Sequence, residues 1–154
     1  MTMNQATEPA AIDLEDNLFF LCTQVVYRRN AALQGALRPL GLMPTEFRVL
    51  SALFRKGPLT MLELAEWTAY ERTRLTHMLH GMEAKGWVER TSMEHDRRTV
   101  VAQITAPGRA LFANAKVEVD RLTDVIISAN SPKELDQIRK GLRTMRAQLI
   151  SMGL

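Results

Sequence analysis

Cysteine is nearly absent from this sequence, with Cys22 the single example among 154 residues. One thiol cannot form a disulfide within the chain, and it excludes a metal site built from several cysteines. Long apolar runs are missing too, because no stretch approaches the roughly 18 residues of a membrane span and the N-terminus has no signal-peptide pattern. We therefore expect a cytoplasmic protein with no membrane partner.

Catalytic patterns are also missing, because no nucleophile, base and orienting group form a recognisable set. We expect neither enzymatic activity nor a cofactor. A content of 46% hydrophobic and 24% charged residues, with no repeat or linker, is typical of one globular domain over residues 1–154. The net charge of +3 permits nucleic-acid binding without requiring it, since basic and acidic residues are interleaved along most of the chain.

Residues 60–85 have the pattern of two helices joined by a tight turn. Thr60 and Glu63 fit a capping box, so the first helix should begin at about Met61. The small Ala69 stands where the turn between the helices is needed. The apolar positions that we expect to pack inward are Leu62, Leu64, Ala65 and Trp67.

The second helix, ending at about Lys85, should have one apolar stripe and one polar face. The stripe consists of Leu75, Met78, Leu79 and Met82, spaced i, i+3, i+4 and i+7. The outward face carries Arg72, Thr73, Arg74, Thr76, His77 and His80. Hydroxyl groups can bond phosphates or bases and an arginine can bind guanine through two hydrogen bonds, so this face suits the DNA major groove. The alternative is that it is only the solvated face of an amphipathic helix.

Two β-branched runs follow and complete the pattern of a winged helix. Gly86 ends the helix, and residues 87–91 and 99–104 are predicted to form antiparallel strands. The loop between them is too long for a two-residue turn and should carry Arg97 and Arg98 at its tip. The expected fold class is therefore mainly α, with a small two- to three-stranded β-wing.

Apolar helices are expected on both sides of this module. Residues 13–37 follow helical spacing, and Pro44 begins another helix that ends at Gly57. Ser131 opens a capping box, which precedes apolar residues three and four apart. The predicted parts are dimerisation helices at 13–38 and 107–152 around a DNA-binding module at 44–105. The alternative is a monomer in which the terminal helices pack only on their own module.

Several sequence blocks point to one known family. They are Leu-Ala-Glu at 64–66, Thr-Arg-Leu-Thr at 73–76, Met-Glu-Ala-Lys-Gly-Trp-Val-Glu-Arg at 82–90, Asp-Arg-Arg at 96–98 and Ile-Thr-Ala-Pro-Gly at 104–108. The chain resembles the MarR (multiple antibiotic resistance regulator) family over nearly its whole length. The resemblance implies a homodimeric winged-helix transcription factor that binds a near-palindromic operator in double-stranded DNA, usually as a repressor released by a small molecule.

The resemblance also gives roles to the wing. Asp96 would brace it, while Arg98, with Arg97 as a second candidate, would reach the minor groove or its phosphates. The alternative is an ion pair within the hairpin, which would contribute only about 0–1 kcal/mol at the surface. Two recognition helices related by a two-fold axis would meet half-sites about 34–36 Å apart.

Some members of this family sense organic hydroperoxides through a cysteine early in the first helix, but Phe19 occupies that position here. Cys22 lies three residues later on an apolar face, where a free cysteine usually behaves as a small hydrophobe, so we do not expect redox sensing. His77 and His80 have a spacing that could chelate zinc. Metal-sensing relatives place their ligands elsewhere, and we expect no metal.

A ligand-released repressor needs an effector site where the first helices meet the DNA-binding module. An aromatic cleft edged by arginines would favour an aromatic carboxylate or its coenzyme A thioester. The candidate residues are Phe19, Phe20, Thr23, Tyr27, Arg28, Arg29 and Arg48. The alternative is that the aromatic residues belong to the ordinary core.

A second function class stays open, in which the winged helix is a scaffold for a protein partner and does not touch DNA. Such a protein would have no need for Arg72, Arg74, Arg97 and Arg98 on one surface. If the protein binds DNA, replacing Arg98 should weaken binding broadly, whereas replacing Arg74 should also relax sequence preference where it reaches a base.

Overall fold

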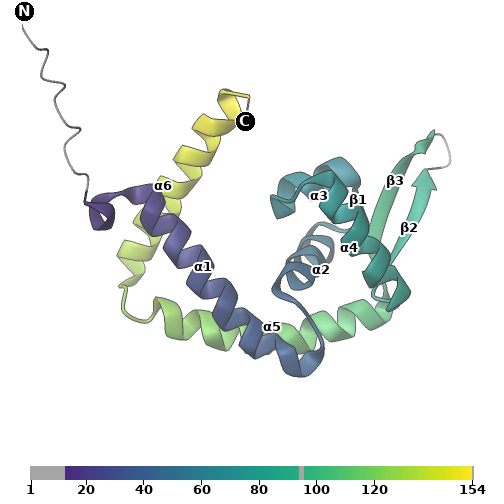
Figure 1. Ribbon diagram of the computed structural model, residues 1–154, viewed down its shortest axis with the longest axis horizontal. Coiled ribbons are helices and arrows are strands. Elements are labelled where there is room, and N and C mark those ends of the chain that lie inside the picture. Colours follow the sequence, from purple (N-terminus) through teal and green to yellow (C-terminus); the bar gives the residue numbers. More distant parts are fainter. Residues whose placement is uncertain (1–12, 94–95, 154) are drawn as a thin grey trace, which may run out of the picture.

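The computed structural model describes residues 13–93 and 96–153, which form a mainly helical protein with one small sheet (Figure 1). The elements in chain order are η1 (Leu14–Asp16), α1 (Leu18–Leu37), η2 (Arg38–Leu40), α2 (Pro44–Lys56), β1 (Leu59–Thr60), α3 (Met61–Thr68), α4 (Arg72–Ala84), β2 (Val88–Met93), β3 (Asp96–Ile104), α5 (Ala106–Ile127) and α6 (Pro132–Ser151). The predicted fold class is confirmed, and the sheet has three strands. Within the described ranges, no helix is both long and apolar enough to cross a membrane.

Helix α5 joins two parts of the molecule (Figure 1). The winged-helix half, comprising α2, α3, α4 and the sheet, lies over the first part of α5. Helix α1 crosses α5, and α6 rises from the far end of α5, so that both form an arm with the second part of α5. The arm and the winged-helix half are thus held together through one long helix.

The core lies in the winged-helix half, where leucines of α2, α3 and α4 meet a phenylalanine of α5. Its fully buried side chains include Leu50, Leu53, Leu64, Leu75, Leu79, Met82 and Phe112. The ring of Phe112 lies 5.3 Å from that of Phe47 and 4.6 Å from that of Phe54, measured between centroids. Each such aromatic pair adds about 0.5–1.5 kcal/mol beyond the area that it buries. Phe112 is therefore a strong link between α5 and α2.

Capping boxes begin α3 and α6, as predicted. Thr60 Oγ1 accepts a hydrogen bond from the Glu63 main-chain N–H at 3.3 Å, and the Glu63 carboxylate accepts one from the Thr60 N–H at 2.8 Å. Ser131 and Glu134 repeat this exchange at 3.3 and 2.7 Å. Both helix starts are therefore fixed by local sequence.

Helix α1 begins at Leu18 rather than at residue 13 as predicted. The Asn17 side chain accepts a hydrogen bond from the Phe20 N–H at 3.0 Å and so caps the helix one residue before it starts. Asp13 accepts from the Glu15 N–H at 3.0 Å and begins the separate turn η1. Two competing cap residues thus divide a segment whose apolar spacing suggested one continuous helix.

Helix α3 corrects a second prediction, because Leu62 and Trp67 do not pack inward. Their side chains are 59% and 52% exposed, whereas Leu64 and Thr68 are buried. At about 100° per residue, Leu62 lies nearly opposite Leu64 on so short a helix. The Trp67 ring instead lies beside α2, where the Lys56 ammonium is 3.9 Å from the ring centroid.

The sheet has the order β1-β3-β2, and β3 is antiparallel to both neighbours. The prediction of a long loop between β2 and β3 is wrong. Pairing of β2 with β3 continues to Met93 and Asp96, so the main chain of Arg97 and Arg98 belongs to β3. Strands pair through main-chain hydrogen bonds, which form whatever the side chains are. The charged side chains at the start of β3 therefore did not identify these residues as part of a strand. The side chains of residues 93–98 lie outside the described part of the structure.

The start of α5 is clamped to the turn that follows α4. Thr105 Oγ1 accepts a hydrogen bond from the Gly108 N–H at 3.1 Å and donates one to the Gly86 carbonyl at 2.6 Å. The Thr105 N–H donates to the Trp87 carbonyl at 3.1 Å. A Cβ atom on Gly108 would lie 2.0 Å from that same Trp87 oxygen. Thr105 and Gly108, two residues of the family-like motif, therefore hold these segments in contact.

The arm leaves a wide apolar surface exposed. Helix α6 buries none of its residues. Exposed large apolar side chains on α1, α5 and α6 include Leu18, Phe19, Val25, Val26, Tyr27, Val117, Val125, Ile126, Ile138, Leu142, Leu149 and Ile150. So many exposed large apolar side chains on three helices indicate a contact site rather than a solvated face.

Gly108→Ala should destabilise the fold by about 3 kcal/mol, because the added methyl group must displace the backbone at Trp87. Chemical denaturation followed by circular dichroism measures this change. Gly81→Ala in α4 is the matched control, since no atom lies within 4 Å of its added Cβ, and it should be neutral or stabilising by up to about 1 kcal/mol. Equal unfolding midpoints for the two variants would show that the clamp at Trp87 is not tight.

Candidate functional site

Helix α4 has the two faces that its sequence predicts. Leu75, Leu79 and Met82 are fully buried against the core, and Met78 is half-buried. All six predicted DNA-binding side chains of this helix are exposed: Arg72, Thr73, Arg74, Thr76, His77 and His80. The structure therefore gathers them on one outward face, and their contact with DNA stays a prediction.

The turn between α3 and α4 positions the first residues of that face. Ala69 has φ 55° and ψ 39°, the left-handed conformation that lets the chain reverse within a few residues. Tyr70 follows, half-buried against the core. The Arg74 guanidinium carbon lies 4.8 Å from the centroid of the Tyr70 ring, so the first turn of α4 contacts this turn through a cation–π interaction.

The last turn of α4 is tied to α2 by a buried carboxylate. Glu46 is only 6% exposed, and it accepts hydrogen bonds from the Met43 main-chain N–H at 2.9 Å and from Lys85 Nζ at 2.8 Å. The first bond caps α2, and the second holds the residue that ends α4. The Glu46 side chain thus caps the start of α2 and holds the end of α4 beside it.

A second carboxylate ties α4 to the wing. Glu83 accepts hydrogen bonds from the Arg90 main-chain N–H at 3.0 Å, from Arg90 Nε at 3.0 Å and from an Arg90 terminal nitrogen at 2.6 Å. These bonds lower the pKa of Glu83 below its usual value, with the side-chain bonds from Arg90 as the main cause. These bonds therefore fix β2 to the last turn of α4.

The wing residues predicted to reach DNA are only partly described. The main chain of Asp96, Arg97 and Arg98 lies in β3, and their side chains fall outside the described residues. Arg72 and Thr99 line one hollow of about 400 Å³ between α3, α4 and β3. The start of α4 and the start of the described wing therefore lie on the same side of the molecule.

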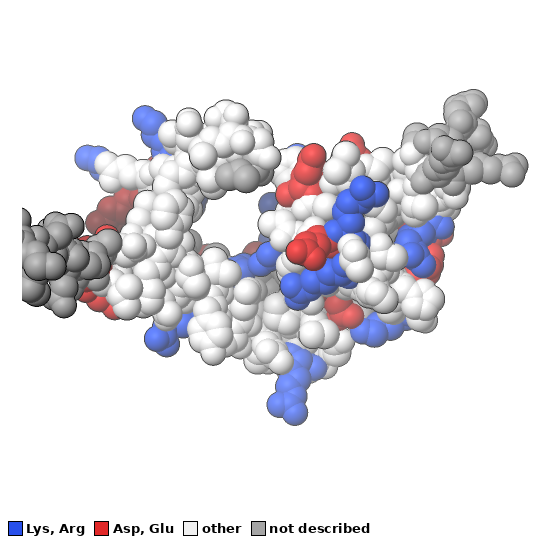
Figure 2. All heavy atoms as spheres, turned by 45° about the horizontal axis from the view of Figure 1, so that its top comes forward, with Lys and Arg blue, Asp and Glu red and all other residues white. Residues whose placement is uncertain are grey.

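Charged side chains gather on the winged-helix half. Figure 2 shows Lys and Arg, with Asp and Glu among them, beside the hollow that separates this half from the arm. The arm in this view is mostly uncharged on the side that faces the hollow. No group of three or more His, Cys, Asp or Glu side chains in the described part of the chain could hold a metal ion, and that includes the surroundings of His77 and His80.

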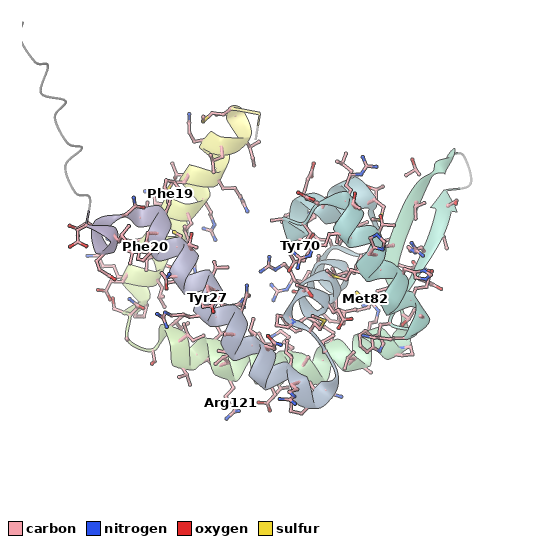
Figure 3. The ribbon with its side chains drawn as sticks, viewed as in Figure 1. Phe19, Phe20, Tyr27, Tyr70, Met82 and Arg121 are labelled. Atoms are coloured by element: carbon pink, nitrogen blue, oxygen red, sulfur yellow. The ribbon has the colours of Figure 1, made fainter. Side chains whose placement is uncertain are left out.

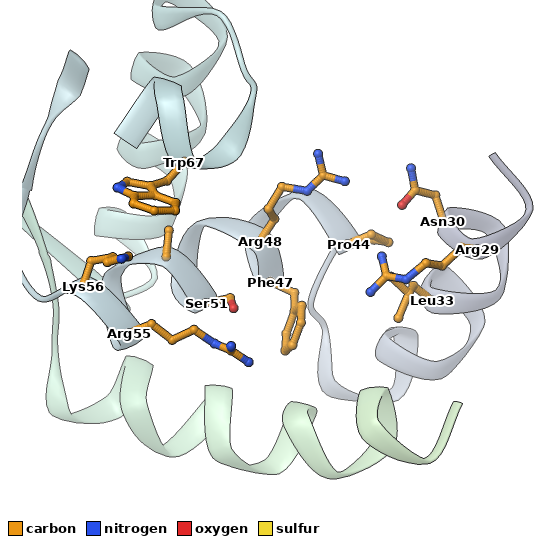
Figure 4. Close-up of a pocket in the computed structure, with 11 residues that line it drawn as sticks. Arg29, Asn30, Leu33, Pro44, Phe47, Arg48, Ser51, Arg55, Lys56 and Trp67 are labelled. Carbon is orange, nitrogen blue, oxygen red and sulfur yellow. The ribbon is translucent and has the colours of Figure 1, made fainter. Parts of the chain in front are cut away.

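A cleft of about 520 Å³ lies between α1, α2 and α3 (Figure 4). Four cationic side chains line it, and none of the described residues that line it is acidic. The cations are Arg29 from α1 and Arg48, Arg55 and Lys56 from α2. Burial, together with the positive charge of Arg48, lowers the pKa of Arg29. Phe47 and Trp67 supply apolar and aromatic surface, so the cleft combines positive charge with flat hydrophobic walls.

The seven predicted effector residues do not share this cleft. Arg29 and Arg48 line it, and Tyr27 lines a neighbouring hollow with Tyr70. Phe20 and Arg28 line a separate hollow, and Thr23 lines a shallow one with Cys22. Phe19 is 65% exposed near the start of α1, away from the winged-helix half (Figure 3). The six predicted residues of α1 are thus spread along that helix, and Arg48 lies on α2.

Sequence reasoning missed Arg55, Lys56 and Trp67. A signal for Arg55 was available, because it lies seven residues after Arg48 and therefore on the same face of α2. No spacing could have found Trp67, which reaches the cleft from another helix after a turn and a strand.

Known proteins resemble this chain in sequence and in fold. The model of the MarR family matches residues 42–100. The chain is 32% identical over 91 residues to the multiple antibiotic resistance protein MarR of Salmonella typhimurium, covering 59% of this chain and 63% of that protein. The match therefore spans less than two thirds of that curated relative.

Solved structures match over more of the chain. A MarR-family transcriptional regulator from Silicibacter pomeroyi has a TM-score of 0.81 at 27% identity, covering 92% of this chain and 96% of that one. The repressor CouR bound to a 23-mer DNA duplex has a TM-score of 0.79 at 26% identity, covering 91% and 99%. CouR from Rhodococcus jostii RHA1 bound to p-coumaroyl-CoA has the same fold, with a TM-score of 0.78 at 23% identity, covering 88% and 95%.

Glu83→Gln should lower the free energy of unfolding at pH 7 by about 1 kcal/mol, because the charged hydrogen bonds to Arg90 weaken at a partly exposed site. The folded-state pKa of Glu83 is below the ordinary 4.5, so its contribution is full above that value and is lost as pH falls through the folded pKa. Denaturation at several pH values should show the gap to wild type closing in acid. Glu66→Gln, on the exposed face of α3, is the control. A gap that persists unchanged at pH 3 would contradict this role of the carboxylate.

Proposed function

Because the chain belongs to the MarR family, we propose that it regulates transcription by binding double-stranded DNA as a homodimer. Helix α4 enters the major groove and the β2–β3 hairpin lies beside it. The observation that carries this proposal is the division of α4 into a fully buried leucine stripe and an exposed face of arginine, threonine and histidine. The DNA-bound CouR structure, with the same fold at 26% identity, supports it.

The chemistry of each exposed residue determines which part of the DNA it contacts. Arg74 carries the base-reading role, since an arginine in the first turn can bind guanine through two hydrogen bonds. Arg72, Thr73, Thr76, His77 and His80 bond phosphates or base edges. In the wing, Arg98 with Arg97 reaches the minor groove or its phosphates, and Asp96 braces the hairpin.

The second copy of the chain covers the arm. The exposed apolar residues of α1, α5 and α6 would be solvated in a monomer, and burying them against the same residues of a partner gives a self-complementary, two-fold contact. That axis places the two α4 helices on half-sites about 34–36 Å apart. Residues 13–38 and 107–152 are then the dimerisation helices of a single domain.

The regulatory ligand occupies the cleft between α1, α2 and α3. Four cations, with no acidic residue among the described residues of the lining, favour an anion, and Trp67 and Phe47 favour a flat ring. An aromatic carboxylate or its coenzyme A thioester meets both conditions. As the ligand lies between the arm and the winged-helix half, it favours one arrangement of the two and releases the repressor from its operator.

Selection from a random duplex pool at about 150 mM salt tests the DNA-binding proposal. A two-fold symmetric site with half-sites one helical turn apart should be enriched. Arg98→Ala should weaken binding to that site and lower the salt slope by about 1, whereas Arg74→Ala should also relax preference at one base position. Arg38→Ala, at an exposed arginine of η2, is the matched control. No enrichment, with only weak salt-sensitive binding, would favour a protein partner instead.

Thermal-shift and tryptophan-fluorescence titrations with p-coumarate and p-coumaroyl-CoA test the effector class. Ligand in the cleft should raise the melting temperature and change the emission of Trp67, and Arg29→Gln should weaken that binding about tenfold through loss of a charged hydrogen bond. Trp67→Phe identifies which tryptophan reports, and Arg38→Gln is the charge control. Absence of stabilisation by both compounds would contradict the proposed ligand class.

A further inference from the structure

One aromatic ring contacts a cation from the cleft and a cation from α4. The guanidinium carbon of Arg48 lies 5.0 Å from the centroid of the Tyr70 ring, and that of Arg74 lies 4.8 Å from the same centroid. Tyr70 stands in the turn between α3 and α4 and packs partly against the core, so its ring has a fixed base (Figure 3). The ring is therefore shared by two functional surfaces that are otherwise built from different helices.

Arg48 is held on the cleft side of this arrangement. It lines the cleft, and its Nη1 atom donates a hydrogen bond to the Thr68 carbonyl at 3.3 Å, at the end of α3. The Arg29 side chain is close enough for the charge of Arg48 to lower its pKa. Two like charges at this end of the cleft make Arg48 responsive to an anion, which would relieve the repulsion between them.

Arg74 is held on the DNA side. Its side chain is exposed, and a long exposed side chain samples many rotamers unless a contact restricts it. The Tyr70 ring supplies such a contact through its negative face. An arginine that is already oriented loses less conformational freedom when it binds a base, so the contact favours binding at that position.

We propose that Tyr70 is a positioning residue that couples the cleft to the base-reading arginine. Arg48 holds the ring, the ring holds Arg74, and an anion that draws Arg48 into the cleft loosens both contacts. This inference rests on the proposed function, because it assigns the route by which the effector site alters DNA binding. The inference concerns only Arg48, Tyr70 and Arg74, and it predicts that the effects of replacing these residues on DNA binding depend on one another.

A set of single and double variants tests the coupling on the full-length protein without any effector. The operator dissociation constant at fixed salt should rise about threefold to tenfold in Arg48→Ala and in Tyr70→Leu. The Arg48→Ala/Tyr70→Leu double variant should be no weaker than the weaker single variant, because each change breaks the same chain of contacts. Tyr70→Phe keeps the ring face and should stay within about twofold of wild type.

The controls separate positioning from charge and from folding. Loss of positive charge alone acts independently of Tyr70, so charge effects of Arg48→Ala would multiply with Tyr70→Leu rather than overlap. Arg38→Ala removes an exposed arginine of η2, outside helices α1, α5 and α6, and should leave operator affinity unchanged. Unfolding curves for every variant exclude loss of folded protein as the cause.

The outcomes distinguish this inference from the proposed function. If the wild-type protein selects no DNA sequence, the proposed function fails and the coupling fails with it. If the wild-type protein binds its operator but the fold-changes of Arg48→Ala and Tyr70→Leu multiply, the coupling alone is overturned. The same conclusion follows if Tyr70→Leu binds as tightly as wild type while Arg74→Ala loses base preference.

Discussion

The contact between the end of α4 and the start of α5 is the constraint on which the rest of the structure depends. Thr105 bonds both Gly86 and its own helix, and Gly108 brings α5 so close to Trp87 that no side chain fits between them. The helix that carries the exposed basic face and the helix that carries the arm therefore share one rigid junction. Any reorientation of α5 is passed to the end of α4 without an intervening flexible segment.

Helix α4 is restrained unequally along its length. Its last turns are fixed by Glu83 to Arg90 and by Glu46 to Lys85, both through charged hydrogen bonds. Its first turn has no side-chain cap from Glu71 and relies on the buried leucine stripe and on contacts around Tyr70. The last turns of α4 are thus fixed to α2 and β2. A small local change can more easily reorient the arginine side chains in the first turn of the helix.

Sequence reasoning succeeded where the controlling interactions are local and failed where they are tertiary. The capping boxes and the stripe from Leu75 to Met82 depend on residues three or four apart, so spacing alone predicts them. The cleft depends on where α1, α2 and α3 meet, and no spacing along the chain contains that information. The hairpin length was missed for another reason, because main-chain pairing continues beneath charged side chains that look like loop sequence.

The two ends of α5 serve different purposes, and its length connects them. Phe112 and Ala115 are buried in the winged-helix half, whereas Val117 and Val125 are 65% and 69% exposed on the arm. From Gly108 to Ile126 the helix rises about 27 Å, so a rotation of about 5° at one end displaces the other by about 2 Å. In the proposed dimer, where the arms are fixed against each other, that displacement falls on the α4 helices. A ligand between α1 and α2 then needs only a small rotation to move two recognition helices out of register with a fixed DNA repeat.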